Sequence, residues 1–135
     1  MLETALYVED LDCAQNFYEA LFGLEVMLRD ERMAALAVPG RQVLLLFKNR
    51  ASLEPAPTPF GLIPPHGSVG AQHMCFAIEL DQLVAWQQRL EEFGIAIESS
   101  LTWPQGATSL YFRDLDGHSI ELSTPRLWPN DPGET

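Results

Sequence analysis

The chain has 135 residues, of which 47% are hydrophobic, and it carries a formal net charge of −11 at neutral pH. This length suits one compact domain that buries roughly two thirds of its unfolded surface. The acidic excess argues against nucleic acid and anionic membranes as partners. The sequence shows neither a signal peptide nor an apolar run of the roughly 20 residues that a spanning helix needs, so we expect a cytoplasmic protein.

The first half of the chain is predicted to form a strand, a helix and three further strands. Polarity alternates along the opening strand, and Asp12 with Gln15 has the spacing of a helix capping box. Gly23 is expected to end that helix in the left-handed conformation. The strands are expected at residues 2–8, 24–28, 33–38 and 43–48.

The second half repeats this order about 70 residues later, with a helix at 81–93 that Gly94 ends. Its strands are expected at residues 72–78, 95–99, 109–113 and 119–123. Five prolines and no periodicity between the halves predict an extended linker. We therefore divide the single domain, 1–135, into module 1 (1–50), a Pro-rich linker (51–70), module 2 (71–124) and a C-terminal tail (125–135).

Cys13 and Cys75 fall in different predicted elements, and in a cytosolic setting we expect both thiols to be reduced. Cys75 lies two residues after His73, and therefore on the same face of its strand. A catalytic thiol is one interpretation of this position, and a small apolar filler is the other.

Glu3, His73 and Glu121 occupy related places in the two halves. Glu3 and His73 lie in the opening strand of each half, and Glu121 lies in the strand that closes the second. One imidazole and two carboxylates form a set that can bind a divalent metal. The competing interpretations are a hydrogen-bonded core histidine for His73 and a solvated carboxylate for Glu3, whereas an unpaired buried carboxylate at Glu121 would be costly.

Strand alternation gives an independent expectation for the second half. If His73 faces a cavity, Cys75 does too, and the outward residues between them are more apolar. The same alternation in the last two strands places polar side chains on the cavity side, namely Ser109, Tyr111, Arg113, Ser119, Glu121 and Ser123. A face of this composition is unlike a packed core.

The run 6–12, residues 17–18 and 21–24 in and after the first helix, and the closing run 109–122 resemble the vicinal oxygen chelate superfamily. That group includes glyoxalase I, extradiol dioxygenases and bleomycin resistance proteins. The resemblance implies an α+β fold of two tandem βαβββ modules that form curved mixed sheets around a central cavity. It also implies metal ligands at Glu3, His73 and Glu121. Members more often have His or Gln at the place of Glu3, and residues 43–47 offer no fourth ligand.

The implied function is a divalent-metal-dependent lyase or isomerase of the glyoxalase type, with Glu121 as the catalytic base and Mn, Fe, Ni, Mg or Zn as the cofactor. We expect a homodimer that acts on a small-molecule substrate, which could be a glutathione conjugate. The substrate-binding residues are expected to be Arg113, Tyr111, Trp103 and Phe47. Two alternatives stay open: a ring-cleaving dioxygenase, and a metal-free drug- or metabolite-binding protein of the bleomycin-resistance type.

Two further histidines lie in loops. His66, in the linker, is either a lid residue over the cavity or a surface histidine. His118 lies in the turn between the last two strands, and we expect it to stay outside the ligand set.

Overall fold

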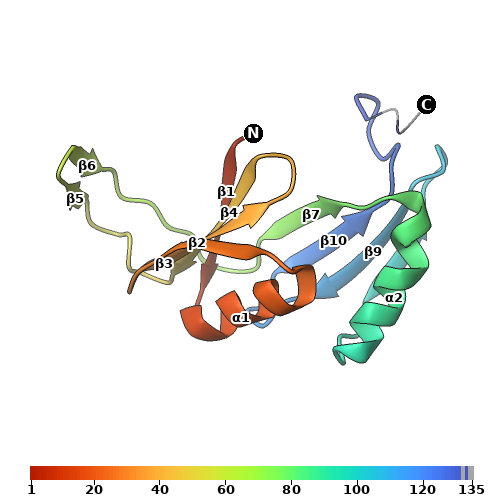
Figure 1. Cartoon of the computed structure of the whole chain (residues 1–135), viewed down its shortest axis with the longest axis horizontal. Coiled ribbons are helices and arrows are strands. Elements are labelled where there is room, and N and C mark those ends of the chain that lie inside the picture. The colour runs from red at the N-terminus through yellow and green to blue at the C-terminus, as the bar shows by residue number, and fades with distance from the viewer. Residues whose placement is uncertain (132, 134–135) are drawn as a thin grey trace. The chain divides into compact units, whose positions relative to one another are not determined.

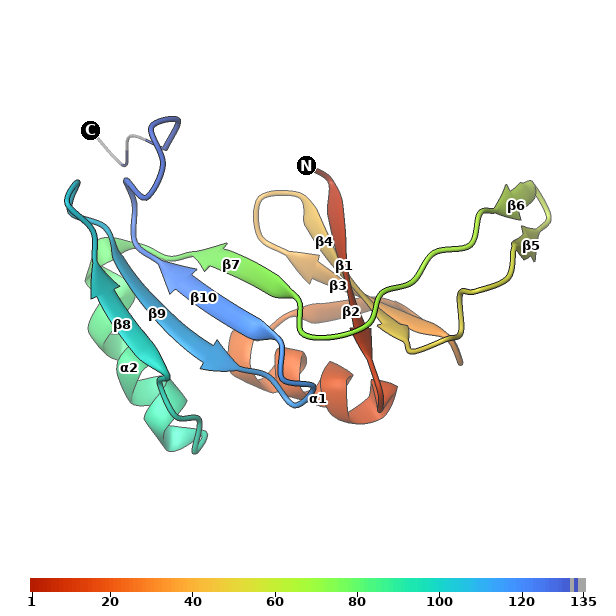
Figure 2. The ribbon, with the colours of Figure 1, turned by 180° about the vertical axis from the view of Figure 1, so that it is seen from behind.

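The computed structural model describes residues 1–131 and 133, and it consists of two compact units, Met1–Gly70 and Ala71–Thr135. Each unit contains one four-stranded sheet and one α-helix (Figures 1 and 2). No helix among the described residues is long and apolar enough to cross a membrane.

The first unit has the order strand, helix, then three strands, followed by a small hairpin. Its elements are β1 (Glu3–Val8), α1 (Leu11–Phe22), β2 (Glu25–Arg29), β3 (Met33–Val38), β4 (Gln42–Lys48), β5 (Ala56–Thr58) and β6 (Gly61–Ile63). The sheet order is β1-β4-β3-β2, with β1 parallel to β4 and the other pairs antiparallel. The hairpin β5–β6 forms a separate two-stranded sheet (Figure 1).

The second unit repeats the arrangement. Its elements are β7 (His73–Ala77), the 3-10 helix η1 (Leu80–Gln82), α2 (Leu83–Glu92), β8 (Ser99–Thr102), β9 (Thr108–Arg113) and β10 (Ser119–Ser123). The sheet order is β7-β10-β9-β8, and β7 is again parallel to its neighbour β10. The predicted α+β class with two βαβββ modules is confirmed.

Three local expectations differ from the structure. The residue that caps α1 is Asp10 rather than Asp12, because the Asp10 carboxylate accepts the backbone N–H of Cys13 at 3.0 Å. Residues 95–98 do not join β8. The linker contains the hairpin β5–β6, which forms despite its prolines because Pro57 lies in a two-stranded sheet where each strand is an edge. The predicted tail includes residues 132, 134 and 135, which lie outside the described residues.

One face of each sheet is apolar and buried. In the first unit α1 packs on β3 and β4, and the buried residues include Leu6, Leu36, Leu44 and Leu46. In the second unit the corresponding face carries Leu110, Phe112, Ile120 and Leu122, each with no exposed surface. Along each strand these buried side chains alternate with side chains on the opposite face of the sheet, as the sequence predicts.

The edge strand β2 contains a β-bulge, and the residue that contacts α1, Arg29, follows it. Val26 pairs with Leu36, but the register shifts before Leu28, so that Arg29 is paired with Ala34. Ala34 is fully buried on the face that carries Leu36, so Arg29, which is paired with it, faces the helix side.

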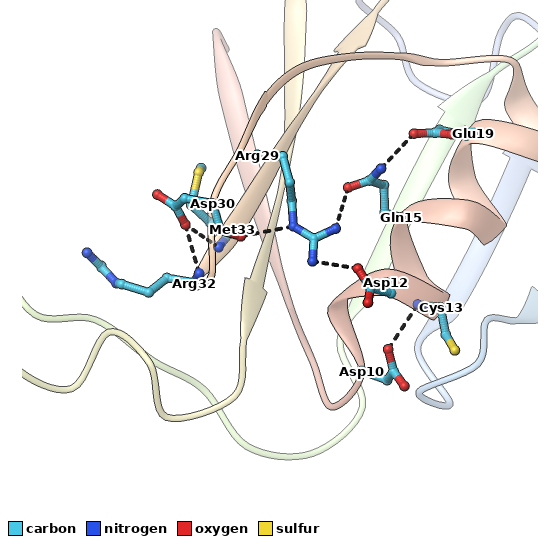
Figure 3. Close-up of polar contacts among 9 residues, drawn as sticks. All are labelled: Asp10, Asp12, Cys13, Gln15, Glu19, Arg29, Asp30, Arg32 and Met33. Carbon is cyan, nitrogen blue, oxygen red and sulfur yellow. Dashed lines mark hydrogen bonds and ion pairs between the residues drawn. The ribbon is translucent and has the colours of Figure 1, made fainter.

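There the guanidinium of Arg29 donates to the carboxylate of Asp12 at 2.7 Å and to the side-chain oxygen of Gln15 at 2.8 Å. Figure 3 shows both contacts, which connect the edge strand with the first turns of the helix. Gln15, which the sequence assigned to a capping box, serves this contact instead and donates to Glu19.

Candidate metal centre

The polar face of the second sheet brings His73 and Glu121 together. His73 opens β7 beside Ser119 of β10, and Glu121, two residues further along β10, is paired with Cys75 and Tyr111. His73 Nε2 lies 3.3 Å from Glu121 Oε1, and the Glu121 side chain is only 5% exposed. The strand alternation that the sequence predicts for this face is therefore what the structure shows.

The hydrogen bonds of His73 determine which of its nitrogens carries a proton. Nδ1 lies 3.0 Å from the backbone carbonyl oxygen of Ser119, which can only accept. Nδ1 must therefore donate. Nε2 then faces the carboxylate of Glu121 with either a proton, which makes the ring an imidazolium, or a lone pair. Two lone pairs at 3.3 Å repel each other, so the space between Nε2 and Oε1 favours a cation.

The second carboxylate oxygen of Glu121 is held by a serine. Ser109, fully buried on β9, donates its hydroxyl to Oε2 at 2.6 Å. The indole N–H of Trp103 in turn donates to the Ser109 hydroxyl oxygen at 2.9 Å. Trp103 was expected to contact substrate, and the structure shows its polar edge engaged with Ser109.

Two neighbours of Glu121 keep their protons at neutral pH. Desolvation, and after it the charge of Glu121, raises the pKa of the Cys75 thiol to about 12. The same two causes, in the same order, raise the pKa of Tyr111. The Tyr111 ring stacks near His73, with ring centroids 6.3 Å apart. A neutral phenol can donate a hydrogen bond, whereas a protonated thiol is a poor nucleophile, which speaks against a catalytic Cys75.

Arg113 lies at the exposed end of β9 and is already paired. Its guanidinium donates to the carboxylate of Glu98 at 2.8 and 3.4 Å, and to the backbone oxygen of Gly117 at 3.1 Å. Arg113 is among the predicted substrate-binding residues, and its charge suits an anionic substrate. An acidic partner in place reduces the positive charge that Arg113 can offer such a substrate.

The matching face of the first sheet is mostly apolar. Glu3 opens β1 in an exposed position, as His73 opens β7. By register, the place of Glu121 is taken by Leu45, which is paired with Ala5 as Glu121 is with Cys75. Across residues 1–131 and 133, no three His, Cys, Asp or Glu side chains form a group that could hold a metal ion.

His66 returns from the linker to the same face of the first sheet. The Tyr7 hydroxyl lies 2.6 Å from His66 Nδ1, and the Phe47 ring meets the imidazole edge-on with centroids 4.4 Å apart. The backbone N–H of His66 also donates to the carbonyl of Ser52 at 2.8 Å. Sequence reasoning missed this cluster, because nothing in the local pattern pairs residue 7 with residue 66.

His118 has a structural role in its turn. It is buried, its Nδ1 accepts the backbone N–H of Gln72 at 2.9 Å, and its own N–H donates to the carboxylate of Asp114. These contacts fix the start of β7 against the β9–β10 turn.

The donor chemistry of His73 and Glu121 fits a divalent ion. An imidazole nitrogen whose opposite N–H is anchored to a backbone carbonyl is the usual form of a metal-binding histidine. A carboxylate oxygen beside it adds negative charge and accommodates several first-row metals.

Comparisons with known proteins give a consistent result. Residues 1–122 match the model of the Glyoxalase/Bleomycin resistance protein/Dioxygenase superfamily. A crystal structure of lactoylglutathione lyase from Agrobacterium tumefaciens is 39% identical, with a TM-score of 0.86 and 96% of each chain covered.

Two curated relatives carry different names. Metallothiol transferase FosB of Bacillus licheniformis is 27% identical over 118 residues, which are 87% of this chain and 70% of that protein. Catechol-2,3-dioxygenase of Bacillus subtilis (strain 168) is 28% identical over 130 residues, 93% of this chain, but the match spans only 42% of that protein's length.

Proposed function

The chain belongs to the Glyoxalase/Bleomycin resistance protein/Dioxygenase superfamily, and we propose that it is a divalent-metal-dependent enzyme of the glyoxalase type. The proposed reaction is a proton transfer next to a carbonyl of a small substrate, which could be a glutathione conjugate. The 39% identity to lactoylglutathione lyase over nearly the whole chain supports this choice among the activities of the family.

The observation that carries the proposal is the arrangement of His73 and Glu121. The Ser119 carbonyl holds Nδ1 as a donor, and this leaves Nε2 directed at the Glu121 carboxylate across 3.3 Å. A bound divalent ion would satisfy both atoms and would polarise a substrate carbonyl oxygen as a Lewis acid.

Glu3 is proposed as the third protein ligand. The support is its place in the repeat: it is the first residue of β1, as His73 is the first residue of β7. Leu45 supplies no donor at the place that corresponds to Glu121. We therefore propose three protein ligands and no fourth, so that positions stay open for water or substrate oxygens. The metal would be Mn, Fe, Ni, Mg or Zn, because the imidazole suits Fe, Ni and Zn and the carboxylates suit Mg and Mn.

The residues around this pair have proposed roles in handling the substrate. Glu121 Oε1, when it is not bound to the metal, would be the proton acceptor. Tyr111, whose raised pKa keeps its hydroxyl protonated, donates to a substrate oxygen. Phe47 and the ring of Trp103 contact apolar parts of the substrate, and Arg113 contacts a carboxylate if it exchanges Glu98 for it. We further propose that the protein is a homodimer.

Metal analysis of the purified protein tests the proposal. Wild type should contain about one equivalent of divalent metal per chain, and His73→Ala should lose it. His66→Ala is the matched control, because His66 contacts Tyr7 and Phe47 rather than the proposed ligands, and it should keep the metal. Retention of full metal by His73→Ala would refute the site, and a metal-free wild type would favour the binding-protein alternative.

Activity is then measured with the hemithioacetal of methylglyoxal and glutathione. Turnover that chelation abolishes and added metal restores would support the lyase. Oxygen uptake with a catechol would instead identify the ring-cleaving dioxygenase.

A second candidate function is metal-dependent thiol transfer, the kind of activity named for FosB. The observation that favours it is the bond from Ser109 to Glu121 Oε2, because a carboxylate held in this way is suited to remain a ligand rather than to leave and act as a base. Formation of a thiol adduct from an electrophilic substrate, without isomerisation of the hemithioacetal, would select this function.

A further inference from the structure

We propose that Ser109 and Trp103 are positioning residues that fix Glu121 as a ligand through one oxygen only. The inference rests on the proposed function, since it assumes that Glu121 binds a divalent metal. It concerns contacts within the second unit alone.

Two hydrogen bonds connect Trp103, Ser109 and Glu121, and the donor and acceptor groups available fix the direction of each. The indole N–H of Trp103 is only a donor, so the Ser109 oxygen accepts it at 2.9 Å. Ser109 has a single hydroxyl proton, and the nearby Glu121 Oε2 at 2.6 Å is the acceptor that takes it. Trp103 therefore orients the hydroxyl of Ser109, and Ser109 donates to Glu121 rather than accepting from it.

Burial makes this arrangement rigid. Ser109 has no exposed surface, the Glu121 residue is 4% exposed and Trp103 is half-buried. Water cannot readily replace a bond between two buried groups, and a short charge-assisted O–H···O bond is among the stronger hydrogen bonds in proteins. Among the described residues, no buried side-chain nitrogen or oxygen is left without a partner.

The consequence is a division between the two carboxylate oxygens. Oε2 is committed to Ser109, while Oε1 faces His73 Nε2. Rotation of the carboxylate to present both oxygens to one cation would break the bond to Ser109. Glu121 should therefore bind a metal through Oε1 alone, and binding through both oxygens should appear only when Ser109 is changed.

Three variants test the role of this chain of hydrogen bonds. Ser109→Ala removes the bond to Glu121, Trp103→Phe removes the indole N–H but keeps an aromatic ring, and Ser109→Thr keeps a hydroxyl. Each protein is titrated with Co²⁺, and the visible absorption of the bound ion reports its coordination. Circular dichroism verifies that each variant is folded.

Ser109→Ala should weaken Co²⁺ binding about 10- to 100-fold, the usual cost of losing a partner of a metal ligand. Its visible absorption should fall, because a second carboxylate oxygen raises the coordination number. Trp103→Phe should show a smaller loss in the same direction, and Ser109→Thr should restore affinity and spectrum. A merely structural role would not change the spectrum of the bound ion.

A measurement on the metal-free protein keeps the two proposals distinguishable. The Trp103 indole N–H should exchange with solvent about tenfold faster in Ser109→Ala and in Glu121→Ala than in wild type. Ser109→Ala removes the oxygen that accepts the indole N–H, and Glu121→Ala removes the carboxylate that accepts the Ser109 hydroxyl proton.

Wild-type affinity and spectrum in Ser109→Ala would overturn the positioning role while leaving the metal site standing. A wild type that binds no Co²⁺ would overturn the proposed function and the positioning role with it. Should Ser109→Ala fail to fold, Trp103→Phe with unchanged affinity and spectrum would overturn the inference.

Discussion

At the scale of single residues, the orientation of His73 comes from a backbone carbonyl, which no side-chain substitution removes. The carbonyl oxygen of Ser119 keeps the proton of His73 on Nδ1. The interaction between His73 and Glu121 therefore depends on the side-chain group of residue 121 that faces Nε2. Glu121 has two oxygens with different partners. Replacing it with Gln, which has the same shape but no charge, therefore tests the effect of the charge alone.

Glu121→Gln should keep the fold but lose the metal. The amide oxygen can still accept from Ser109, and the amide N–H₂ can donate to a neutral His73 Nε2, so all contacts stay satisfied. We expect the free energy of unfolding of the metal-free protein to change by less than about 1 kcal/mol. Metal affinity should fall by about 100-fold or more. Urea unfolding and metal titration measure the two quantities, and a strongly destabilised variant would contradict the hydrogen-bond assignment.

Cys75 should react slowly with thiol reagents. Its pKa of about 12 leaves roughly one thiol in ten thousand as thiolate at pH 8. In metal-free Cys13→Ser protein, alkylation by iodoacetamide should be far slower than that of glutathione, and should accelerate about tenfold per pH unit as the pH rises toward 12. Mass spectrometry measures the rate. Labelling as fast as glutathione would show that the pKa of the Cys75 thiol is not raised.

At the scale of secondary-structure elements, both helices end at a left-handed glycine. Gly23 has φ 67° and donates its N–H to the Glu19 carbonyl at 2.9 Å, and Gly94 has φ 68°. A Cβ at Gly23 would meet no atom within 4 Å, so its replacement tests backbone strain without any clash.

Gly23→Ala should lower the free energy of unfolding by about 1 kcal/mol, because an L-residue is strained in this conformation. Gly23→Asn is the matched comparison and should cost less, since Asn tolerates the left-handed region better. Urea unfolding of the three proteins measures the difference. Equal stability of Gly23→Ala and wild type would mean that α1 can end in another way.

Several elements follow from the sequence because their signals are local. Alternation in residues 109–113 and 119–123 predicts which side chains share the face of Glu121, and the structure confirms Ser109 and Tyr111 there. The glycine ends of the helices are likewise visible in the sequence. The bulge in β2 is not, because Met27 looks like any other strand residue and only the pairing with β3 shows the shift.

At the scale of the whole molecule, the repeat is what the sequence predicts best, and contacts distant in the chain are what it predicts least. The two sheets have matching strand orders, as expected from the repeated pattern. The pair His66 and Tyr7, and the pair Arg113 and Glu98, depend on how loops fold back onto strands. Such tertiary contacts leave no periodic trace, so the role predicted for Arg113 in substrate binding did not include its acidic partner.

The proposed homodimer should depend on salt. Each chain carries a formal charge of −11, so two copies repel each other at low ionic strength, and screening shortens from about 10 Å at 0.1 M to 3 Å at 1 M. Sedimentation equilibrium should give twice the chain mass of 15.1 kDa, with tighter association at about 0.5 M than at about 0.05 M NaCl. A mass of 15.1 kDa at every concentration would contradict the dimer.

The bulge at Met27 also matters for how this family's sequences are aligned and how they can change. Removal of the Met27 codon would turn the bulge into a regular ladder and leave the flanking pairs as they are, with Leu28 opposite Ala35 and Arg29 opposite Ala34 on the side of Asp12. A homologue that lacks one residue at this position should therefore keep the same charged contact to its first helix, and its alignment gap belongs at Met27.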